Sequence, residues 1–132
     1  MTAPLYHGSC LCGGVTYDVT GPLRTVVACH CSQCRKTSGH YVAATQARAA
    51  DLHVRGDTLQ WYRSSATAQR GFCGRCGGNL FWRPDDRPVV SIFAGTIDDT
   101  GALKMTAQIY CEDKGSYYDL PDCSIVARET VI

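Results

Sequence analysis

Seven of the nine cysteines in this chain lie in three short motifs whose spacing is typical of metal ligands. The motifs are Cys10-Leu11-Cys12, Cys29-His30-Cys31-Ser32-Gln33-Cys34 and Cys73-Gly74-Arg75-Cys76. Zinc prefers four ligands, so a site with four protein thiols is closed, whereas a site with three keeps one position for a substrate. The two outer motifs together supply four thiols and the central motif supplies three. We therefore predict two zinc ions per chain, one structural and one catalytic.

The four-thiol site is predicted to join two distant parts of the chain. Residues two apart in a strand point to the same face, so Cys10 and Cys12 would present both sulfurs together. Cys73 and Cys76 form a Cys-x-x-Cys knuckle, in which Gly77 permits a tight backbone. Zinc held by these four thiolates would have a structural role. The alternative is that either pair consists of buried free cysteines.

The central motif wraps three sulfurs around one ion. Cys29 and Cys31 are two apart, and Cys34 follows at knuckle spacing. Three thiolates give a zinc dication a net negative charge, which weakens its ability to polarise a carbonyl or acidify water. Such a zinc instead favours an incoming thiol, bound as a thiolate whose sulfur then attacks an electrophile. Spacing and charge thus predict the capture of a small thiol.

Several residues near the motifs have roles that the sequence leaves open. Arg75 either offsets the negative charge of the four-thiolate site or is a solvated surface residue. His30 lies between two cysteines and should face away from them, so we expect a surface or hydrogen-bonding role. Cys111 and Cys123 are candidate fourth ligands of the central motif, although a lone cysteine in a strand is most often buried packing. The remaining histidines are expected to be structural or exposed: His7, His40 and His53.

The composition argues against several classes of protein. With 132 residues, 45% hydrophobic and 19% charged, the chain fits one globular domain over residues 1–132. A net charge of +1 offers no clustered basic surface for nucleic acid, and no apolar run is long enough to cross a membrane. The first residues lack a secretory signal, which predicts a cytoplasmic location. In that reducing compartment, nine cysteines favour metal binding over disulfides.

Short apolar segments between turn signals predict an all-β fold with little helix. Most segments are rich in β-branched or aromatic residues, which favour strands. Turn signals such as Gly21-Pro22 and Gly77-Gly78-Asn79 separate them. A helix of one or two turns is expected at most, within Ala43–Leu52 or just after Cys31. The six predicted strands cover residues 15–19, 41–45, 59–63, 80–82, 89–93 and 108–110.

Four ordered motifs extend the cysteine pattern over nearly the whole chain: Gly8-Ser9-Cys10-Leu11-Cys12-Gly13-Gly14, Cys29-His30-Cys31-Ser32-Gln33-Cys34-Arg35-Lys36-Thr37-Ser38-Gly39, Arg70-Gly71-Phe72-Cys73-Gly74-Arg75-Cys76-Gly77 and Ala94-Gly95-Thr96-Ile97-Asp98-Asp99. Together they resemble the glutathione-dependent formaldehyde-activating enzyme family, also called the centromere protein V domain family. The resemblance implies a β-tent of antiparallel sheets stabilised by zinc. It also implies a structural zinc on Cys10, Cys12, Cys73 and Cys76, and a catalytic zinc on Cys29, Cys31 and Cys34.

The activity implied by the resemblance is that of a zinc-dependent carbon–sulfur lyase, similar to S-hydroxymethylglutathione synthase. Such an enzyme condenses glutathione with formaldehyde or a related small aldehyde. Arg35 and Lys36 are our candidates to bind the carboxylates of the thiol. Many family members carry a histidine where this chain has Gln108, and a tryptophan near the place of Tyr117; Gln108 cannot act as an acid or base. Two alternatives remain, namely a non-catalytic zinc-stabilised thiol carrier or protein-binding module, and a related lyase for a different thiol adduct.

Overall fold

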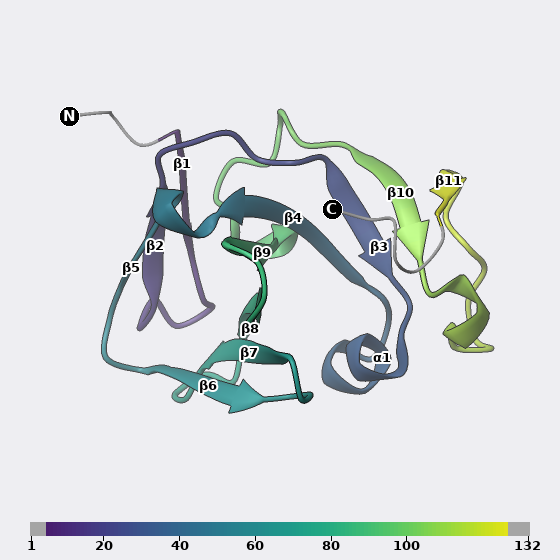
Figure 1. The fold of residues 1–132 in the computed structure, drawn as a ribbon, viewed down its shortest axis with the longest axis horizontal. Helices are drawn as coiled ribbons and strands as arrows, with labels where there is room; N and C mark the ends of the chain where they lie inside the picture. Colours follow the sequence, from purple (N-terminus) through teal and green to yellow (C-terminus); the bar gives the residue numbers. More distant parts are fainter. Residues whose placement is uncertain (1–4, 127–132) are drawn as a thin grey trace.

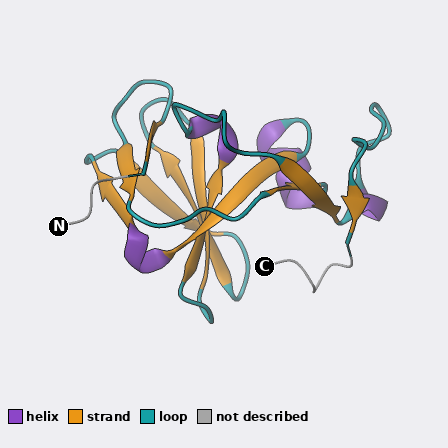
Figure 2. Ribbon diagram, turned by 90° about the horizontal axis from the view of Figure 1, so that it is seen from above, coloured by secondary structure: helices purple, strands orange, loops and turns teal. Residues whose placement is uncertain are grey.

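The computed structural model describes residues 5–126, which form two β-sheets and one short α-helix. Figure 2 shows that strands make up most of the fold, as the sequence predicts, and that the helical turns are short. The smaller sheet has the strand order β1-β2-β5 and is antiparallel. Its strands are Tyr6–Ser9 (β1), Thr16–Val19 (β2) and Leu52–Arg55 (β5).

The larger sheet has the order β11-β10-β3-β4-β9-β8-β7-β6. Its strands are Val26–Cys29 (β3), Val42–Arg48 (β4), Leu59–Arg63 (β6), Ala68–Cys73 (β7), Asn79–Pro84 (β8), Val89–Phe93 (β9), Met105–Ile109 (β10) and Ser124–Ile125 (β11). The pairings from β3 to β6 are antiparallel, as expected, whereas β10 pairs in parallel with both β3 and β11. Parallel neighbours need a long crossover, and the chain between β3 and β10 supplies it. In Figure 1, β10 and β11 lie on one side of β3, and the smaller sheet lies on the other.

All six predicted strands are present, as β2, β4, β6, β8, β9 and β10. The α-helix follows Cys31, at one of the two places expected, and spans Ser32–Ser38 (α1). The other expected place, Ala43–Leu52, holds β4 and a single 3-10 turn, because residues 42–48 pair with strands on both sides. No helix among residues 5–126 is both long and apolar enough to span a bilayer. The 3-10 turns are Ala49–Asp51 (η1), Ala94–Thr96 (η2) and Cys111–Asp113 (η3).

The two faces of the larger sheet differ in chemistry because successive strand residues alternate between them. On β9, Val90 and Ile92 belong to the same buried cluster as Tyr17 of the smaller sheet. Ser91 and Phe93 lie on the opposite face of that strand. One face therefore packs against the smaller sheet as the core, and the other is available to line a cavity.

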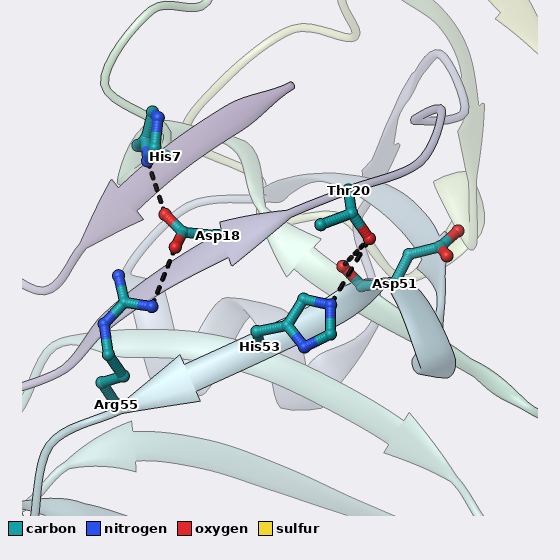
Figure 3. A network of polar contacts seen from close by, with 6 residues as sticks. All are labelled: His7, Asp18, Thr20, Asp51, His53 and Arg55. Atoms are coloured by element: carbon teal, nitrogen blue, oxygen red, sulfur yellow. Dashed lines mark hydrogen bonds and ion pairs between the residues drawn. The ribbon is translucent and has the colours of Figure 1, made fainter. Parts of the chain in front are cut away.

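The outer face of the smaller sheet carries a polar network (Figure 3). His7, Asp18 and His53 are directly opposed on β1, β2 and β5. Asp18 contacts His7 Nδ1 and accepts a hydrogen bond from Arg55 Nη1 at 2.8 Å, and the pKa of Asp18 is lowered mainly by Arg55. Thr20 Oγ1 lies 3.4 Å from His53 Nε2. Exposed ion pairs of this kind contribute little to stability, so this network mainly supports the sheet. His7 also lines a second cavity, which contains none of the motif cysteines.

Two glycines with positive φ allow a test of how tightly the turns are packed. Gly56 has φ +115°, and a Cβ there would lie 2.0 Å from the Gly14 carbonyl oxygen; Gly39 has φ +81° with open space around it. We expect Gly39→Ala to cost about 1–2 kcal/mol from backbone strain alone. Gly56→Ala should cost about 3 kcal/mol or more, because strain and steric overlap add. Denaturant unfolding at saturating zinc measures both, and equal losses would contradict the packing described here.

Candidate metal centres

The four predicted structural ligands converge from two turns. Cys10 and Cys12 lie in the turn between β1 and β2, and not in a strand as the sequence suggested, because the pairing of β1 with β2 ends at Ser9. Cys73 ends β7, and Cys76 lies in the turn that leads to β8. The four Sγ atoms all lie within 4.8 Å of one another. These cysteines could therefore hold one metal ion between them.

The distances between these sulfurs fit a tetrahedral site. Cys12 Sγ lies 3.7 Å from Cys10 Sγ and 3.7 Å from Cys73 Sγ. Zn–S bonds of about 2.3 Å in a tetrahedron place the sulfurs about 3.8 Å apart. A disulfide would bring two sulfurs to about 2.05 Å. The four thiols are spaced for a shared metal ion and not for disulfides.

Polar contacts favour the thiolate forms of two of the four cysteines, Cys12 and Cys73, whereas burial raises the pKa of Cys10. Thr58 Oγ1 lies 3.3 Å from Cys73 Sγ, and this contact is the main cause that lowers the pKa of Cys73 to about 5. Arg75 Nε donates to Cys12 Sγ at 3.3 Å. The pKa of Cys12 is lowered by the Gly14 N–H and then by the Arg75 guanidinium. Of the two roles left open for Arg75, the structure supports charge compensation.

The three predicted catalytic ligands surround the start of α1. Cys29 ends β3, Cys31 is the N-cap of α1, and Cys34 is buried in the helix. The Cys34 N–H donates to Cys31 Sγ at 3.4 Å, so the cap itself orients one ligand. All three Sγ atoms lie within 4.8 Å of one another, and no fourth Cys, His, Asp or Glu of residues 5–126 joins them. The group is one ligand short of a tetrahedral zinc site.

The three sulfurs cannot all carry a negative charge together without a cation. The pKa of Cys31 is lowered to about 2 by hydrogen bonds with Cys29 and then Cys34. The pKa of Cys29 is raised, mainly by its contacts with Cys31 and Cys34. One sulfur therefore takes the charge while a neighbour keeps its proton. A divalent cation would remove this conflict, so the donor set fits a metal ion.

A buried arginine lies beside the three-thiol group. Arg70 on β7 is 8% exposed, and its Nη2 donates to Cys34 Sγ at 3.8 Å. Its Nε donates to Gln33 Oε1 at 3.0 Å, and Gln33 Nε2 donates to the Ser64 carbonyl at 3.0 Å. Among the ion pairs of the described residues, none joins Arg70 to a carboxylate. The pKa of Cys34 is raised to about 11, so its sulfur becomes a charged partner for Arg70 only when a cation shared by the three sulfurs removes its proton.

His30 faces away from the cysteines, as expected, and is fully buried. Its Nε2 lies 3.0 Å from Gln108 Oε1, and its Nδ1 lies 2.7 Å from the Tyr118 hydroxyl. The Gln108 amide donates to the carbonyls of Pro121 at 2.9 Å and Cys123 at 3.1 Å, which fixes Oε1 as the acceptor. His30 Nε2 therefore donates, and Nδ1 accepts from Tyr118. Burial lowers the pKa of His30, which favours this neutral form.

The other cysteines and histidines take no part in either group within residues 5–126. Cys111 and Cys123, the candidate fourth ligands, belong to neither set of converging donors. His7 and His53 lie in the exposed network of the smaller sheet. His40 packs against Tyr41, with ring centroids 4.4 Å apart.

A cavity of about 700 Å³ opens beside the three-thiol group and is lined by all three of its cysteines. None of the four-thiol cysteines lines it. The floor of the cavity is the free face of the larger sheet. It includes residues directly opposed on β7, β8 and β9, namely Arg70, Trp82 and Ser91. The three-thiol group thus faces space for a ligand, and the four-thiol group lies outside this cavity.

The arginines around the cavity are not those suggested by the sequence. Arg35 and Lys36 lie on α1, outside the cavity lining. Arg24, Arg70 and Arg87 line it instead. These three come from the segment before β3, from β7 and from the turn after β8. Their proximity is a product of the fold, and no spacing in the sequence could have indicated it.

Comparison with known proteins agrees with the two cysteine groups. The family model described as "Glutathione-dependent formaldehyde-activating enzyme" matches residues 5–113, which contain all seven motif cysteines. The chain belongs to the glutathione-dependent formaldehyde-activating enzyme family. A lyase of Schizosaccharomyces pombe, described as uncharacterized, is 26% identical over 128 residues, covering 96% of this chain and 89% of that protein. A crystal structure of a Rhodobacter sphaeroides protein shares the fold, with a TM-score of 0.58 and 29% identity over 76% of this chain and 99% of that chain.

The two groups should respond differently to the loss of one ligand. Cys12→Ser removes a ligand that ties the β1–β2 turn to β7, and zinc binding in such sites contributes on the order of 10 kcal/mol to folding. We expect this variant to unfold at a much lower temperature or not to fold at all. Cys31→Ser should bind one zinc ion fewer and keep the fold. Native mass spectrometry and thermal unfolding check both, and equal thermal losses would be inconsistent with separate roles.

Arg70 should matter to metal affinity at the three-thiol group. Arg70→Met removes the charge beside Cys34, so we expect zinc or cobalt affinity there to fall by about tenfold, as is typical when a group that orients a ligand is lost. Arg70→Lys should keep part of the affinity. Chelator competition and the thiolate-to-cobalt absorption band measure this directly. Arg75→Met is the matched control and should weaken only the four-thiol site; an unchanged affinity in Arg70→Met would refute the role of Arg70.

Proposed function

We propose that this chain is a zinc-dependent carbon–sulfur lyase that binds a small thiol, glutathione above all, and condenses it with formaldehyde or a related small aldehyde. The family name and the relative named as a lyase support this class of reaction. The observation that carries the proposal is the contrast between the two cysteine groups. The three-thiol group is one ligand short and lines a cavity, while the four-thiol group is complete and lies outside it.

Each cysteine group is assigned one zinc ion. The four-thiol group would hold a structural zinc that joins the β1–β2 turn to the end of β7. The catalytic zinc would be held by Cys29, Cys31 and Cys34. When bound there, zinc lowers the pKa of a thiol that occupies its fourth position. Arg70, in contact with Cys34, would supply a fixed positive charge beside one of the ligands of that zinc.

The proposed reaction is an addition that keeps every atom of both reactants. The S–H bond of the thiol breaks, and the sulfur electron pair forms an S–C bond at the aldehyde carbon. The C=O π electrons move to oxygen, which takes up a proton to give the S-hydroxymethyl product. Both nitrogen atoms of neutral His30 are engaged with Gln108 and Tyr118, so proton exchange is assigned to solvent in the open cavity.

The cavity floor has an apolar part next to Cys29 and a polar part farther along the sheet. Val27, Ala44 and Phe93 are directly opposed on β3, β4 and β9 and line its floor next to Cys29. These apolar groups exclude water from the thiol stem and concentrate a small aldehyde beside it. The polar part of the floor begins at Ser91 on the neighbouring row. The cavity floor next to Cys29 is therefore apolar, whereas Arg70 and Gln33 make the side next to Cys34 polar.

The proposed activity predicts that the zinc-loaded protein accelerates the addition of glutathione to formaldehyde above the rate in buffer. Cys31→Ser should reduce the rate to that background, because it removes a ligand that faces the cavity. Cys111→Ser, which alters a cysteine outside both groups, should leave the rate unchanged. The rates are measured by following S-hydroxymethylglutathione at several enzyme concentrations, with the uncatalysed reaction subtracted. A fully zinc-loaded protein with no acceleration would refute the formaldehyde reaction; glutathione binding without turnover would point to the thiol carrier instead.

A further inference from the structure

Arg24 is a half-buried cation whose hydrogen-bond partners are neutral. Its Nη2 donates to the Ala44 carbonyl and its Nε donates to the Thr25 carbonyl, each at 3.1 Å. No ion pair of the described residues joins Arg24 to a carboxylate. Its pKa is lowered by burial and then by the positive charge of Arg87. A charge taken from water without a counterion is costly, so this guanidinium is placed to receive an anion.

Arg87 adds a second positive charge to the same end of the cavity. Its closest carboxylate is that of Asp86, at 3.7 Å, and the Asp86 side chain is 77% exposed. A surface pair of this length contributes little and leaves the Arg87 guanidinium available. Arg24 and Arg87 both line the cavity, and repulsion from Arg87 contributes to the lowered pKa of Arg24. An anion between them would turn this repulsion into two attractive contacts.

Ser91 supplies a neutral donor on the floor between these arginines and the rest of the cavity. It is 8% exposed, and its Oγ accepts a hydrogen bond from Gln46 Nε2 at 3.1 Å. Because Oγ already accepts, its own O–H can donate to a ligand in the cavity. Gln46 also lies next to Arg24, since the Arg24 N–H donates to the Gln46 carbonyl at 2.9 Å. The row of opposed residues formed by Arg70, Trp82 and Ser91 thus continues through Gln46 to Arg24.

The arginines lie at a distance from the cysteines that suits a short peptide. Arg24 precedes Cys29 by five residues on an extended segment, which places their Cα atoms at most about 18 Å apart. A fully extended tripeptide spans about 10 Å, and the arginine side chain extends inward over part of the remaining distance. A thiol bound at the cysteine group can therefore place a remote carboxylate between Arg24 and Arg87.

We propose that Arg24 and Arg87, together with the Ser91 hydroxyl, form a carboxylate-binding subsite at the end of the cavity remote from the three-thiol group. The subsite selects thiols that carry a carboxylate over neutral thiols of the same size. This inference rests on the proposed function for the identity of the thiol site. It gives Arg24 and Arg87 the role that the sequence suggested for Arg35 and Lys36.

The first test compares glutathione with its diethyl ester, in which both carboxylates are blocked, as the thiol in the formaldehyde reaction. We expect Arg87→Met and Arg24→Met each to raise the KM for glutathione by about tenfold to a hundredfold, the usual effect of losing a hydrogen bond to a charged group. The KM for the diester should change less than about threefold, since it lacks the carboxylates. Arg24→Lys should restore part of the affinity for glutathione. Arg55→Met, which removes an exposed arginine of the smaller sheet, should behave as the wild type.

The second test measures binding of S-methylglutathione by calorimetry, which needs neither a reactive thiol nor turnover. The wild type should bind it. Arg87→Met alters a partly exposed side chain in the turn after β8 and should spare the fold, but it should weaken binding by about tenfold. A loss in Arg35→Met with none in Arg87→Met would overturn the subsite. Equal KM changes for glutathione and the diester would also overturn it. If glutathione addition is not accelerated but S-methylglutathione binding still depends on Arg24 and Arg87, the proposed reaction fails while the subsite stands.

Discussion

Repulsion between thiolates is the constraint on which this structure depends. Two unit charges about 4 Å apart repel by about 4 kcal/mol at an effective dielectric constant of about 20. Four thiolates make six such pairs, and their sum exceeds the 5–15 kcal/mol that stabilises a typical domain. Cys10, Cys12, Cys73 and Cys76 nevertheless lie within 4.8 Å of one another. A cation that they share reverses the sign of this energy, and it adds to the hydrogen bonds by which Arg75 already joins the two turns at Cys12.

The same electrostatics organise the second group and the cavity beside it. Three thiolates leave a divalent cation with excess negative charge, and the buried guanidinium of Arg70 offsets part of it at Cys34. Arg24 and Arg87 add two further positive charges to the cavity lining, which also contains the carboxylates of Asp86 and Asp113. A ligand with a thiol at one end and a carboxylate at the other would meet complementary charge at both ends. Chemistry and selectivity thus come from charges on five different segments that the larger sheet brings to one face.

The sequence predicted the cysteine groups well because ligand spacing is local and chemically specific. It also placed His30 correctly, since a residue between two ligands must point elsewhere. It failed for Cys10 and Cys12, which converge through a turn that short spacing alone cannot distinguish from a strand. Five strands were not predicted, namely β1, β3, β5, β7 and β11. Four of them have four residues or fewer, and β7 is interrupted by Arg70 and Gly71. Arg24 and Arg87 could not be recognised, because only cross-strand register and the turn after β8 bring them to the cavity.

Gln108, where the resemblance to the family leads one to expect a histidine, makes three side-chain hydrogen bonds. Its side chain accepts from His30 and donates to the carbonyls of Pro121 and Cys123, so these three bonds connect β10 to the loop that carries Cys29 and Cys31 and to the segment before β11. A neutral histidine has one donor and one acceptor, so at this position it could not make all three. The amide gives up acid–base chemistry and fixes the tautomer of His30 instead. Since both nitrogen atoms of His30 are then engaged, the segment that carries Cys29 and Cys31 is held by a fully satisfied, uncharged network. In this chain, therefore, position 108 orients the loop that presents the open metal site and takes no proton from the substrate.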